Sequence, residues 1–171
     1  YAADEGTRLG LSADRFQAAL FFASRRSVEI FDIWRQEFRG GDRLVRVMAS
    51  QAANAWVSEQ KLSFEDAYEE CDALAIAPYM ILCPSPTSSP SAQEVGLWPA
   101  DRVLDYLEGT ALPEAIGWMR DSKEAADRYG GELIAYEAGQ HAVGVQGGEN
   151  VDAAPGVFMA ATRPERRGAR Y

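Results

Sequence analysis

The sequence has few of the residues that most often build metal, redox and disulfide sites. Its 171 residues include two cysteines and one histidine. His141 has no second histidine, cysteine or aspartate at ligand spacing, so the sequence predicts neither a metal site nor a cofactor. Cys71 and Cys83 flank a predicted strand of about ten residues, which separates them beyond the roughly 4.4–6.8 Å between the Cα atoms of a disulfide. We expect both to be free thiols.

The sequence also lacks long apolar runs and basic clusters. No apolar run approaches the roughly 18 residues of a membrane span, and no charged-then-apolar leader is present, so we expect no membrane or targeting segment. The sequence does not determine the cellular compartment, and a secreted or periplasmic parent protein is one alternative. The net charge of −9 disfavours nucleic acids and anionic membrane surfaces as partners. The most basic segment, residues 163–171, is predicted to be a solvated tail.

The sequence alternates between apolar strand-like segments and segments with helical spacing. Three short apolar segments, residues 43–50, 73–80 and 132–139, are typical of buried strands in a parallel sheet. Segments with helical spacing cover residues 12–38, 54–62, 63–70, 98–109 and 112–131. This alternation predicts an α/β fold with three parallel strands and flanking helices. The length is that of about one domain.

Several residues mark where these helices should begin and end. Ser12 is expected to cap the long first helix, and Gly40–Gly41 to stop it. Ser63 and Asp66 have the spacing of a capping box, although glutamate or glutamine is more usual than aspartate at the second position. Gly130–Gly131 is expected to end the last helix.

One predicted connection is unusually long. Residues 83–93, CPSPTSSPSAQ, are rich in proline and serine and follow the carboxyl end of the second predicted strand. Connections of this length are uncommon unless they are functional or unstructured. The segment is therefore either a disordered surface loop or a lid over a site, and the sequence leaves both open.

Polar and aromatic residues gather after the carboxyl ends of the predicted strands. In parallel α/β folds these ends form the site, because the loops there can vary without disturbing the core. Amides, a phenol, an indole and one carboxylate suit a neutral polyhydroxyl ligand, so the sequence predicts a carbohydrate partner. The residues concerned are Gln51, Asn54, Trp56, Tyr79, Glu137, Gln140 and His141.

Some of these residues have a structural alternative. Trp56 could pack in the core, and Tyr79 could bond a backbone carbonyl at the rim of the sheet. Glu137 is harder to explain in this way. A carboxylate that follows Leu-Ile-Ala-Tyr must be paired, or solvated in a cleft, to avoid a large desolvation cost. We therefore predict that Glu137 is a functional residue.

Four segments resemble the carboxyl-terminal half of bacterial glycoside-hydrolase-like (β/α)8 barrel proteins, often described only as cellulose-binding or hypothetical proteins. The segments are RSVEIFDIWRQEF, RLVRVMASQAANAWVSEQ, DALAIAPYM and LIAYEAGQHAVGV, and the resemblance covers nearly the whole chain. Its most specific pieces are ASQAANAWVSE and YEAGQH. The resemblance implies a partial TIM-barrel fold in which the predicted strands are barrel strands five to seven. Residues 1–171 are then expected to be one α/β segment, a fragment of a larger barrel domain.

The resemblance also implies roles for two residues. In the wider clan of retaining glycosidases, a glutamate at the end of strand seven is the nucleophile, which falls on Glu137. An aromatic residue after strand six orients that nucleophile, which falls on Tyr79. The family usually has Glu-Gly-Gly where this chain has Glu-Ala-Gly, and Ala138 would disfavour a positive φ there.

The clan's acid/base is a glutamate after an asparagine at the end of strand four, and this chain has no Asn–Glu pair. The GEN at residues 148–150 has the reverse order. Retaining hydrolysis needs two carboxyl groups about 5 Å apart, so half a site is expected, inactive in the isolated chain. No eighth strand is evident, because residues 156–167 are typical of a helix start followed by a tail.

The sequence thus predicts a glycoside-hydrolase-like protein in which Glu137 is nucleophile or stabiliser. The other strand-end residues named above would position the sugar. The alternatives are a non-catalytic carbohydrate-binding protein, for example one that binds cellulose, and a scaffold without a ligand. A partial barrel leaves two open sheet edges, so we also expect self-association or association with the missing barrel half.

Overall fold

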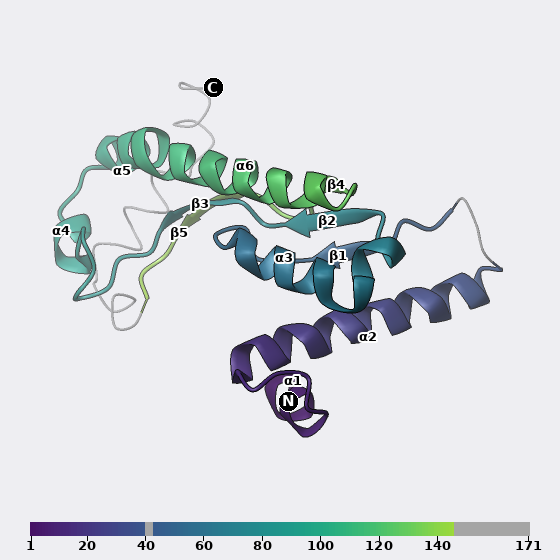
Figure 1. Ribbon diagram of the computed structural model, residues 1–171. Coiled ribbons are helices and arrows are strands. Elements are labelled where there is room, and N and C mark those ends of the chain that lie inside the picture. Colours follow the sequence, from purple (N-terminus) through teal and green to yellow (C-terminus); the bar gives the residue numbers. More distant parts are fainter. Residues whose placement is uncertain (40–42, 146–171) are drawn as a thin grey trace. The chain divides into compact units, whose positions relative to one another are not determined.

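The structure, a computed structural model, describes residues 1–39 and 43–145 (Figure 1). The chain divides into two compact units. The first comprises Tyr1–Pro78 and Trp118–Glu137, and the described part of the second comprises Tyr79–Gly117 and residues 138–145. Each unit is described by itself. In the described ranges no helix is both long enough and apolar enough to cross a membrane.

The first unit contains a three-stranded parallel sheet. Its strands are β1 (Val47–Ala49), β2 (Ala73–Ile76) and β4 (Glu132–Ala135), in the order β1-β2-β4. All four residues of β2 are buried, as expected for a central strand with a neighbour on each side. The α/β class and the parallel pairing of three strands confirm the prediction from the sequence.

The second predicted strand, residues 73–80, is not continuous. It divides at Ala77–Pro78 into β2 and a separate strand, β3 (Tyr79–Leu82). Proline has no N–H to donate to a neighbouring strand, so hydrogen-bonded pairing is interrupted at this point. The prediction of a single strand here is wrong.

The third predicted strand, residues 132–139, divides in the same way. It ends as β4, and the chain resumes as β5 (Gly139–Ala142), which pairs in parallel with β3 in a two-stranded sheet of the second unit. The positive φ in this stretch, +136°, belongs to Gly139 and not to Ala138. The alanine therefore carries no backbone strain. The first predicted strand, residues 43–50, is also shorter than expected, since only β1 forms.

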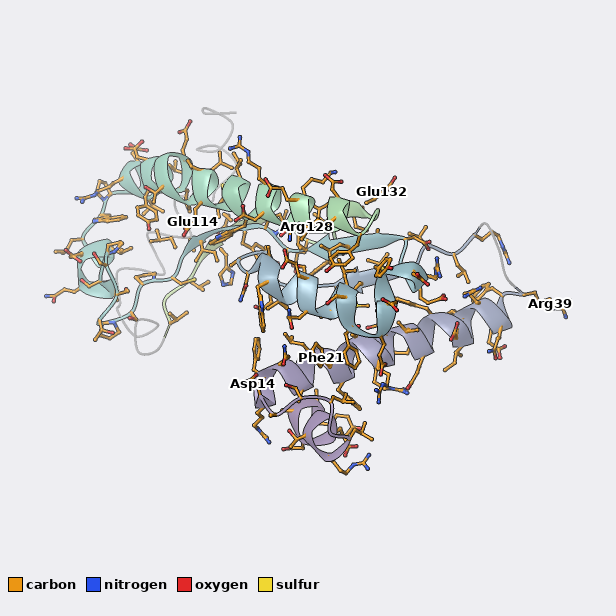
Figure 2. All side chains as sticks on the ribbon, in the orientation of Figure 1. Asp14, Phe21, Arg39, Glu114, Arg128 and Glu132 are labelled. Carbon is orange, nitrogen blue, oxygen red and sulfur yellow. The ribbon has the colours of Figure 1, made fainter. Side chains whose placement is uncertain are left out.

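Two helices open the first unit, α1 (Ala2–Arg8) and α2 (Arg15–Glu37). The cap of α2 is Asp14, whose carboxylate accepts a 2.7 Å hydrogen bond from the Gln17 amide (Figure 2). Ser12 instead accepts from the Asp14 amide, so the predicted cap lies two residues too early. The expected stop, Gly40–Gly41, lies outside the described residues.

The predicted capping box at Ser63 and Asp66 does not form. Ser63 ends α3 (Ala55–Ser63), and the kinked 3₁₀ segment η1 (Phe64–Glu70) follows directly. Asp66 has a φ of +55° in this segment. A capping box does form where Ser91 and Glu94 open α4 (Ala92–Gly96). The longer side chain of glutamate reaches back to the Ser91 amide at 2.7 Å.

Helices cover the three-stranded sheet and contribute three of the five buried residues of its core cluster. The core contains Met48 of β1 and Leu74 of β2, together with Leu62 of α3 and Ala126 of α6 (Leu112–Arg128). Val28 and Phe31 of α2 pack against this cluster. The glycines predicted to end α6 do so, because Gly130 takes a φ of +71° just beyond its last residue.

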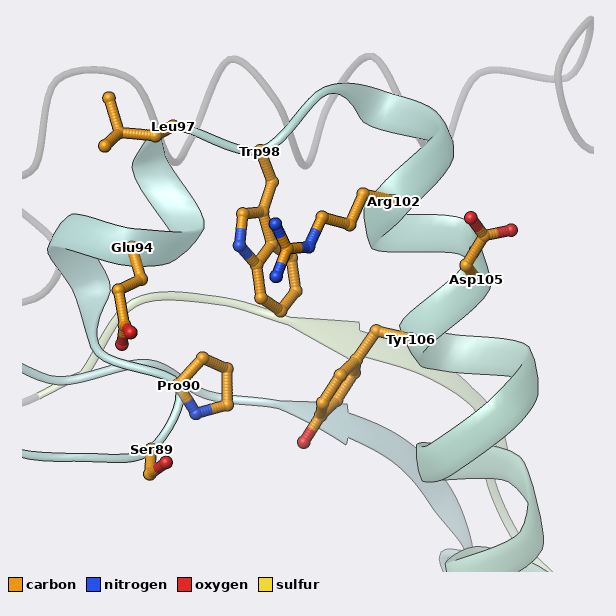
Figure 3. A pocket seen from close by; sticks show the side chains of 8 residues that line it. All are labelled: Ser89, Pro90, Glu94, Leu97, Trp98, Arg102, Asp105 and Tyr106. Atoms are coloured by element: carbon orange, nitrogen blue, oxygen red, sulfur yellow. The ribbon is translucent and has the colours of Figure 1, made fainter.

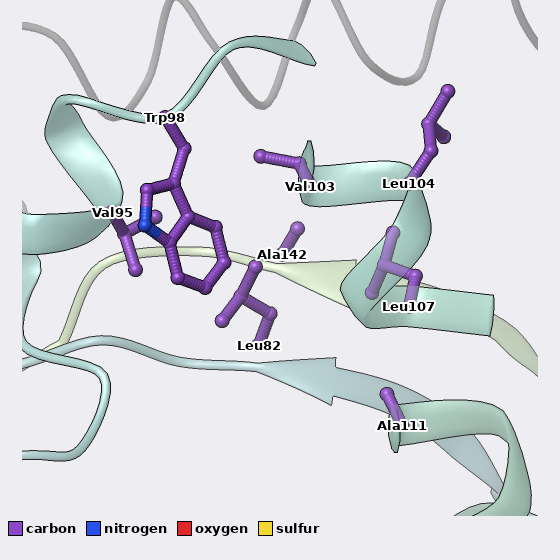
Figure 4. Packing of buried hydrophobic residues seen from close by; sticks show 8 residues of the cluster. All are labelled: Leu82, Val95, Trp98, Val103, Leu104, Leu107, Ala111 and Ala142. Atoms are coloured by element: carbon purple, nitrogen blue, oxygen red, sulfur yellow. The ribbon is translucent and has the colours of Figure 1, made fainter. Parts of the chain in front are cut away.

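The second unit packs two short helices and a π turn on the β3–β5 sheet. The elements are α4, α5 (Ala100–Tyr106) and η2 (Leu107–Ala111), which leads into α6. Figure 4 shows the buried cluster that joins them. It consists of Leu82, Val95, Trp98, Val103, Leu104, Leu107, Ala111 and Ala142.

The Pro/Ser-rich segment 83–93 has a defined path. Ser85 is buried, its amide donates to the Ser88 hydroxyl at 2.7 Å, and the Ser88 hydroxyl donates to the Pro90 carbonyl at 2.7 Å. The Ala92 amide closes the segment by donating to the Ser85 carbonyl at 2.8 Å. The two cysteines are free thiols, as expected. The predicted basic tail, residues 163–171, lies outside the described residues, as do residues 148–150 and 156–167.

Candidate functional site

The carboxyl ends of β1, β2 and β4 lie along one side of the three-stranded sheet, which we call its carboxyl edge. The Ser50 amide donates to the Ala75 carbonyl at 2.8 Å, and the Tyr136 amide donates to the Ile76 carbonyl at 3.2 Å. Backbone pairing therefore continues to the ends of the strands. Because the strands are parallel neighbours, the segments that follow β1 and β4 leave the sheet at the same edge.

Glu137 is the carboxylate at this edge. It follows β4 by two residues, and its side chain is exposed. Within residues 1–39 and 43–145, no hydrogen bond or ion pair engages this carboxylate. Glu137 is thus solvated and not paired, which avoids the desolvation cost, whereas the expected cleft around it stays a prediction.

Three predicted ligand-binding residues follow β1. Gln51 and Asn54 are exposed, and Asn54 caps α3 without a hydrogen bond from its side chain. Trp56, in the first turn of α3, is 44% exposed and stacks on Phe16 of α2, with 6.3 Å between the ring centroids. Trp56 is therefore anchored on one side and open to solvent elsewhere, which differs from a residue buried in the core.

Two side chains of α3 brace the turn that carries these residues. The buried Ser58 hydroxyl donates to the Ser50 hydroxyl at 2.7 Å. The Lys61 ammonium donates to the Ala49 carbonyl, and burial lowers the pKa of Lys61. Neither residue was predicted from the sequence. Their spacing of three along a helix, which places them on one face, was the available signal.

The remaining predicted site residues lie in the second unit. Tyr79 begins β3 and His141 lies in β5, and their ring centroids are 5.4 Å apart. The Gln140 side-chain oxygen accepts a 3.2 Å hydrogen bond from the Ala142 amide. The structure thus brings Tyr79 and His141 together. The expected action of Tyr79 on Glu137 joins residues of different units and stays a prediction.

The arrangement in the first unit offers one exposed carboxylate and two exposed amides at the carboxyl edge of the sheet. A carboxylate can attack an electrophilic carbon or stabilise positive charge, and amides can donate to and accept from hydroxyl groups. In residues 50–54, 77–79 and 136–141, Glu137 is the one acidic side chain. In the described residues, no group of three or more His, Cys, Asp or Glu side chains is placed to hold a metal ion.

Comparison with known proteins found no relative of this chain. The chain matches no family model, no curated protein and no solved structure.

Proposed function

We propose that this chain is part of a (β/α)8 barrel domain and supplies Glu137 as the nucleophile of a retaining, glycosidase-like site. The observation that carries the proposal is the exposed Glu137 carboxylate at the carboxyl edge of a parallel sheet. Enzymes built on parallel barrels place their catalytic groups at this edge. Glu137 is also the residue on which the nucleophile of the resembling family falls.

The topology of the first unit is compatible with a barrel segment. The strand order β1-β2-β4 follows the order of the chain, and helices connect the strands, as in consecutive units of a (β/α)8 barrel. Three of the four β4 residues are exposed, and Ile134 retains 38% of its accessible surface. A further strand beside β4 would cover this apolar side chain, and barrel closure provides such a strand.

In the proposed mechanism, a Glu137 oxygen attacks the anomeric carbon of a bound sugar, and the bond to the leaving oxygen breaks. A second carboxyl group, from outside the described strand ends, protonates that oxygen and later activates the water that releases the sugar. Gln51 and Asn54 hydrogen-bond sugar hydroxyls. Without the second carboxyl group, a leaving group that needs a proton departs roughly 10²- to 10⁴-fold more slowly.

The alternative is a carbohydrate-binding protein without catalysis. The observation that favours it is that the described strand ends carry a single acidic side chain beside the partly exposed ring of Trp56. An indole face and amide groups suffice to bind a sugar, and cellulose is one candidate ligand.

A substrate with a highly activated leaving group tests the two functions, because it needs no acid. We expect 2,4-dinitrophenyl 2-deoxy-2-fluoro-glycosides, in the gluco, galacto, manno and xylo configurations, to form a stable ester with one member of the set. Peptide mapping by mass spectrometry should place that ester on Glu137. Saturating amounts of the matching oligosaccharide should slow the labelling.

Three results would contradict the nucleophile assignment. One is labelling of another residue, and a second is no labelling by any sugar that calorimetry shows to be bound, which instead supports the binding protein. The third is hydrolysis of oligosaccharides by this chain that Glu137→Gln leaves unchanged, because it would require another nucleophile.

A further inference from the structure

The hollow between α4 and α5 in the second unit contains charged side chains that the protein itself already engages (Figure 3). The Arg102 guanidinium lies over the Trp98 ring, 4.5 Å from its centroid. Glu94 accepts from the Ser91 amide at 2.7 Å, and Asp105 points away from the Trp98 ring (Figure 3). The charged groups of this hollow therefore do not define a class of ligand. A groove in the first unit differs, because it adjoins the open side of an edge strand.

This groove lies between α2 and residues 44–47 and has a volume of about 310 Å³. Its apolar lining consists of Ile30, Phe31, Trp34, Leu44, Val45 and Val47. Ile30, Trp34 and Val45 retain 43%, 50% and 69% of their accessible surface. The charged residue of the lining, Arg46, is bonded to Glu70 and Asp72. The groove is therefore suited to an apolar occupant.

The groove adjoins backbone groups of β1 that face away from the sheet. β1 pairs with β2 alone among the described strands. The Arg46 carbonyl accepts from the Asp72 amide at 2.8 Å. The Ser50 amide donates to the Ala75 carbonyl at 2.8 Å. Because bonding alternates along a strand, the amide and carbonyl of Val47 point to the open side, where no described strand pairs with them. An extended chain can add there as a further strand.

The opposite edge of the same sheet, β4, is an extended segment of this kind. The amides of Glu132 and Tyr136 donate to carbonyls at the two ends of β2, at 3.3 Å and 3.2 Å. The backbone groups of Leu133 and Ala135 therefore point to the open side of β4. The side chain of Ile134 retains 38% of its accessible surface.

The side chains of the two open edges are complementary. On each edge a charged residue is followed, at a spacing of two, by two apolar or aromatic residues, and this spacing places side chains on one face of an extended chain. A parallel alignment of the two edges pairs Arg43 with Glu132, Val45 with Ile134, and Val47 with Tyr136. Arg43 and Glu132 are exposed, and neither has an ion pair within residues 1–39 and 43–145. Opposite charges and apolar side chains on neighbouring strands each stabilise the pairing.

These features favour β4 of a second copy as the occupant of the groove. Within one copy β2 separates β1 from β4, so the two open edges face away from each other. The β1 edge of a second copy would offer no acidic residue to Arg43, because residues 43–49 contain none. The β4 edge of a second copy offers Glu132.

We propose that the groove and the open side of β1 bind β4 of a second copy as an added parallel strand. The Val47 amide donates to the second copy's Ala135 carbonyl, and the second copy's Leu133 side chain enters the groove beside Trp34. Because each copy carries both edges, two such contacts close a dimer. The proposal goes beyond the proposed function and does not depend on Glu137 as a nucleophile.

Analytical ultracentrifugation of the whole chain from 1 to 100 μM tests the proposal. The wild type should associate in this range. Arg43→Glu and Glu132→Arg each bring like charges together and should each weaken the association at least roughly tenfold. An equimolar mixture of the two variants should restore it, because both contacts of the mixed dimer then join opposite charges. Circular dichroism verifies folding of each variant.

Glu124→Arg is the matched control. It makes the same charge reversal as Glu132→Arg in an exposed residue of α6 that belongs to neither edge strand, and it should leave the association unchanged. The groove has its own test. Trp34→Ala should weaken the association, whereas Trp34→Phe should largely retain it, because an aromatic ring still packs on the added strand.

The proposal fails if the wild type stays monomeric at 100 μM, or if both charge reversals leave the association intact. It also fails if each reversal weakens the association and the mixture does not restore it, because the contact would then not join β1 to β4. Covalent labelling of Glu137 by the activated glycosides is measured separately. Labelling without association would leave the proposed function standing and overturn this interface, and association without labelling would do the reverse.

Discussion

The two ends of the three-stranded sheet differ in how their charged side chains are bonded. At the amino end, the Arg46 guanidinium donates to Asp72 at 2.7 Å and to Glu70 at 2.8 Å, and Arg35 of α2 donates to the same Glu70 at 2.9 Å. At the carboxyl end, the exposed Glu137 makes no such contact within the described ranges. Both ends carry acidic residues, and the two ends differ in whether arginine side chains bond to Glu70 and Asp72 or leave Glu137 without such a bond in the described ranges.

Backbone bonds strengthen this contrast. At the amino end the Arg46 amide also donates to the Asp72 carboxylate at 2.7 Å, and the Asp72 amide returns a 2.8 Å bond to the Arg46 carbonyl. These contacts tie the starts of β1 and β2 together. In barrel folds, bonded residues at the amino end of the sheet serve stability, whereas available polar groups at the carboxyl end serve function. The exposed Glu137 therefore differs from Glu70 and Asp72 in having its carboxylate available to a ligand, which the proposed function requires.

The largest expected effect separates the two ends of β4. Glu137→Gln should reduce covalent labelling by an activated 2-fluoro glycoside by at least roughly 10³-fold, because it removes the attacking oxygen. Glu132→Gln makes the same change in an exposed residue at the amino end of the same strand and should leave labelling unchanged. Mass spectrometry over time measures both rates.

The same substitution should leave stability almost unchanged. Glu137→Gln is expected to change the free energy of unfolding by less than about 0.5 kcal/mol, as is usual for an exposed residue without partners. If it unfolds the protein, or if Glu132→Gln abolishes labelling equally, the division of the sheet into a stabilising and a functional end is wrong.

The next effect concerns the amino end. Asp72→Asn should lower the free energy of unfolding by about 1–2 kcal/mol, because it removes the charge from the bonds to Arg46. This figure allows for solvent screening, since the Asp72 side chain retains 40% of its exposure. Urea denaturation measures the loss. Asp127→Asn, which breaks an exposed helix pair with Lys123, is the matched control and should cost no more than about 0.5 kcal/mol.

Acid should erase the difference between wild type and Asp72→Asn. Hydrogen bonds from the Arg46 side chain hold the pKa of Asp72 below its ordinary value of 3.8. A carboxyl group with a lowered folded pKa contributes stability that is fully present above its unfolded pKa and is lost as the pH falls through the folded value. Urea titrations from pH 7 downward should show a constant difference that shrinks below pH 3.8. A difference that persists unchanged in acid would contradict the pairing.

A smaller effect concerns the open edges of the sheet. β1 and β4 are the edge strands of the described sheet, and Ile134 on β4 is partly exposed, so we expect the chain to self-associate at micromolar concentration. Ile134→Lys should weaken that association roughly tenfold, because like charges would meet at the edge. Analytical ultracentrifugation measures the association. A monomeric wild type at tens of micromolar would show that the edges do not recruit a partner.

The smallest effect belongs to the turn after β1. Asparagine at a helix cap commonly contributes about 0.5–2 kcal/mol through its side-chain bond, but the Asn54 side chain makes no such bond. Asn54→Ala should therefore change stability by only a few tenths of a kcal/mol. A loss above 1 kcal/mol, measured by thermal unfolding, would assign the residue a structural role and weaken the case that it is available to a sugar.

The α/β class and the three parallel strands could be predicted because apolar runs and helical spacing are local features of the sequence. The strand ends could not. The interruption at Pro78 was marked by a residue without an N–H, whereas the one at residues 136–138 has no proline and depends on which strand pairs with β5. The seven-residue helix α1 was also missed, because it spans too few turns to show a period.

The candidate site shows the same division. The sequence could predict that Glu137 is either paired or solvated, because a carboxylate follows an apolar run, and its functional role stays a prediction. The bracing by Ser58 and Lys61 required knowledge of which face of α3 meets the sheet. The packing of Arg102 on the Trp98 ring in the second unit also had a signal in the sequence. Trp98, Arg102 and Tyr106 are spaced four residues apart, which indicates one face of a helix and its approach.

The two free cysteines fall one in each unit, Cys71 in the first and Cys83 in the second. Burial raises the pKa of both thiols, so at neutral pH each holds less thiolate than an unfolded cysteine and reacts more slowly with an alkylating reagent. The reaction rate of each thiol therefore reports on the opening of its own unit. If the modification rates of both thiols rise at the same urea concentration, the units open as one cooperative block. If they rise at different urea concentrations, one unit opens while the other stays closed, and a single unfolding midpoint does not describe the molecule.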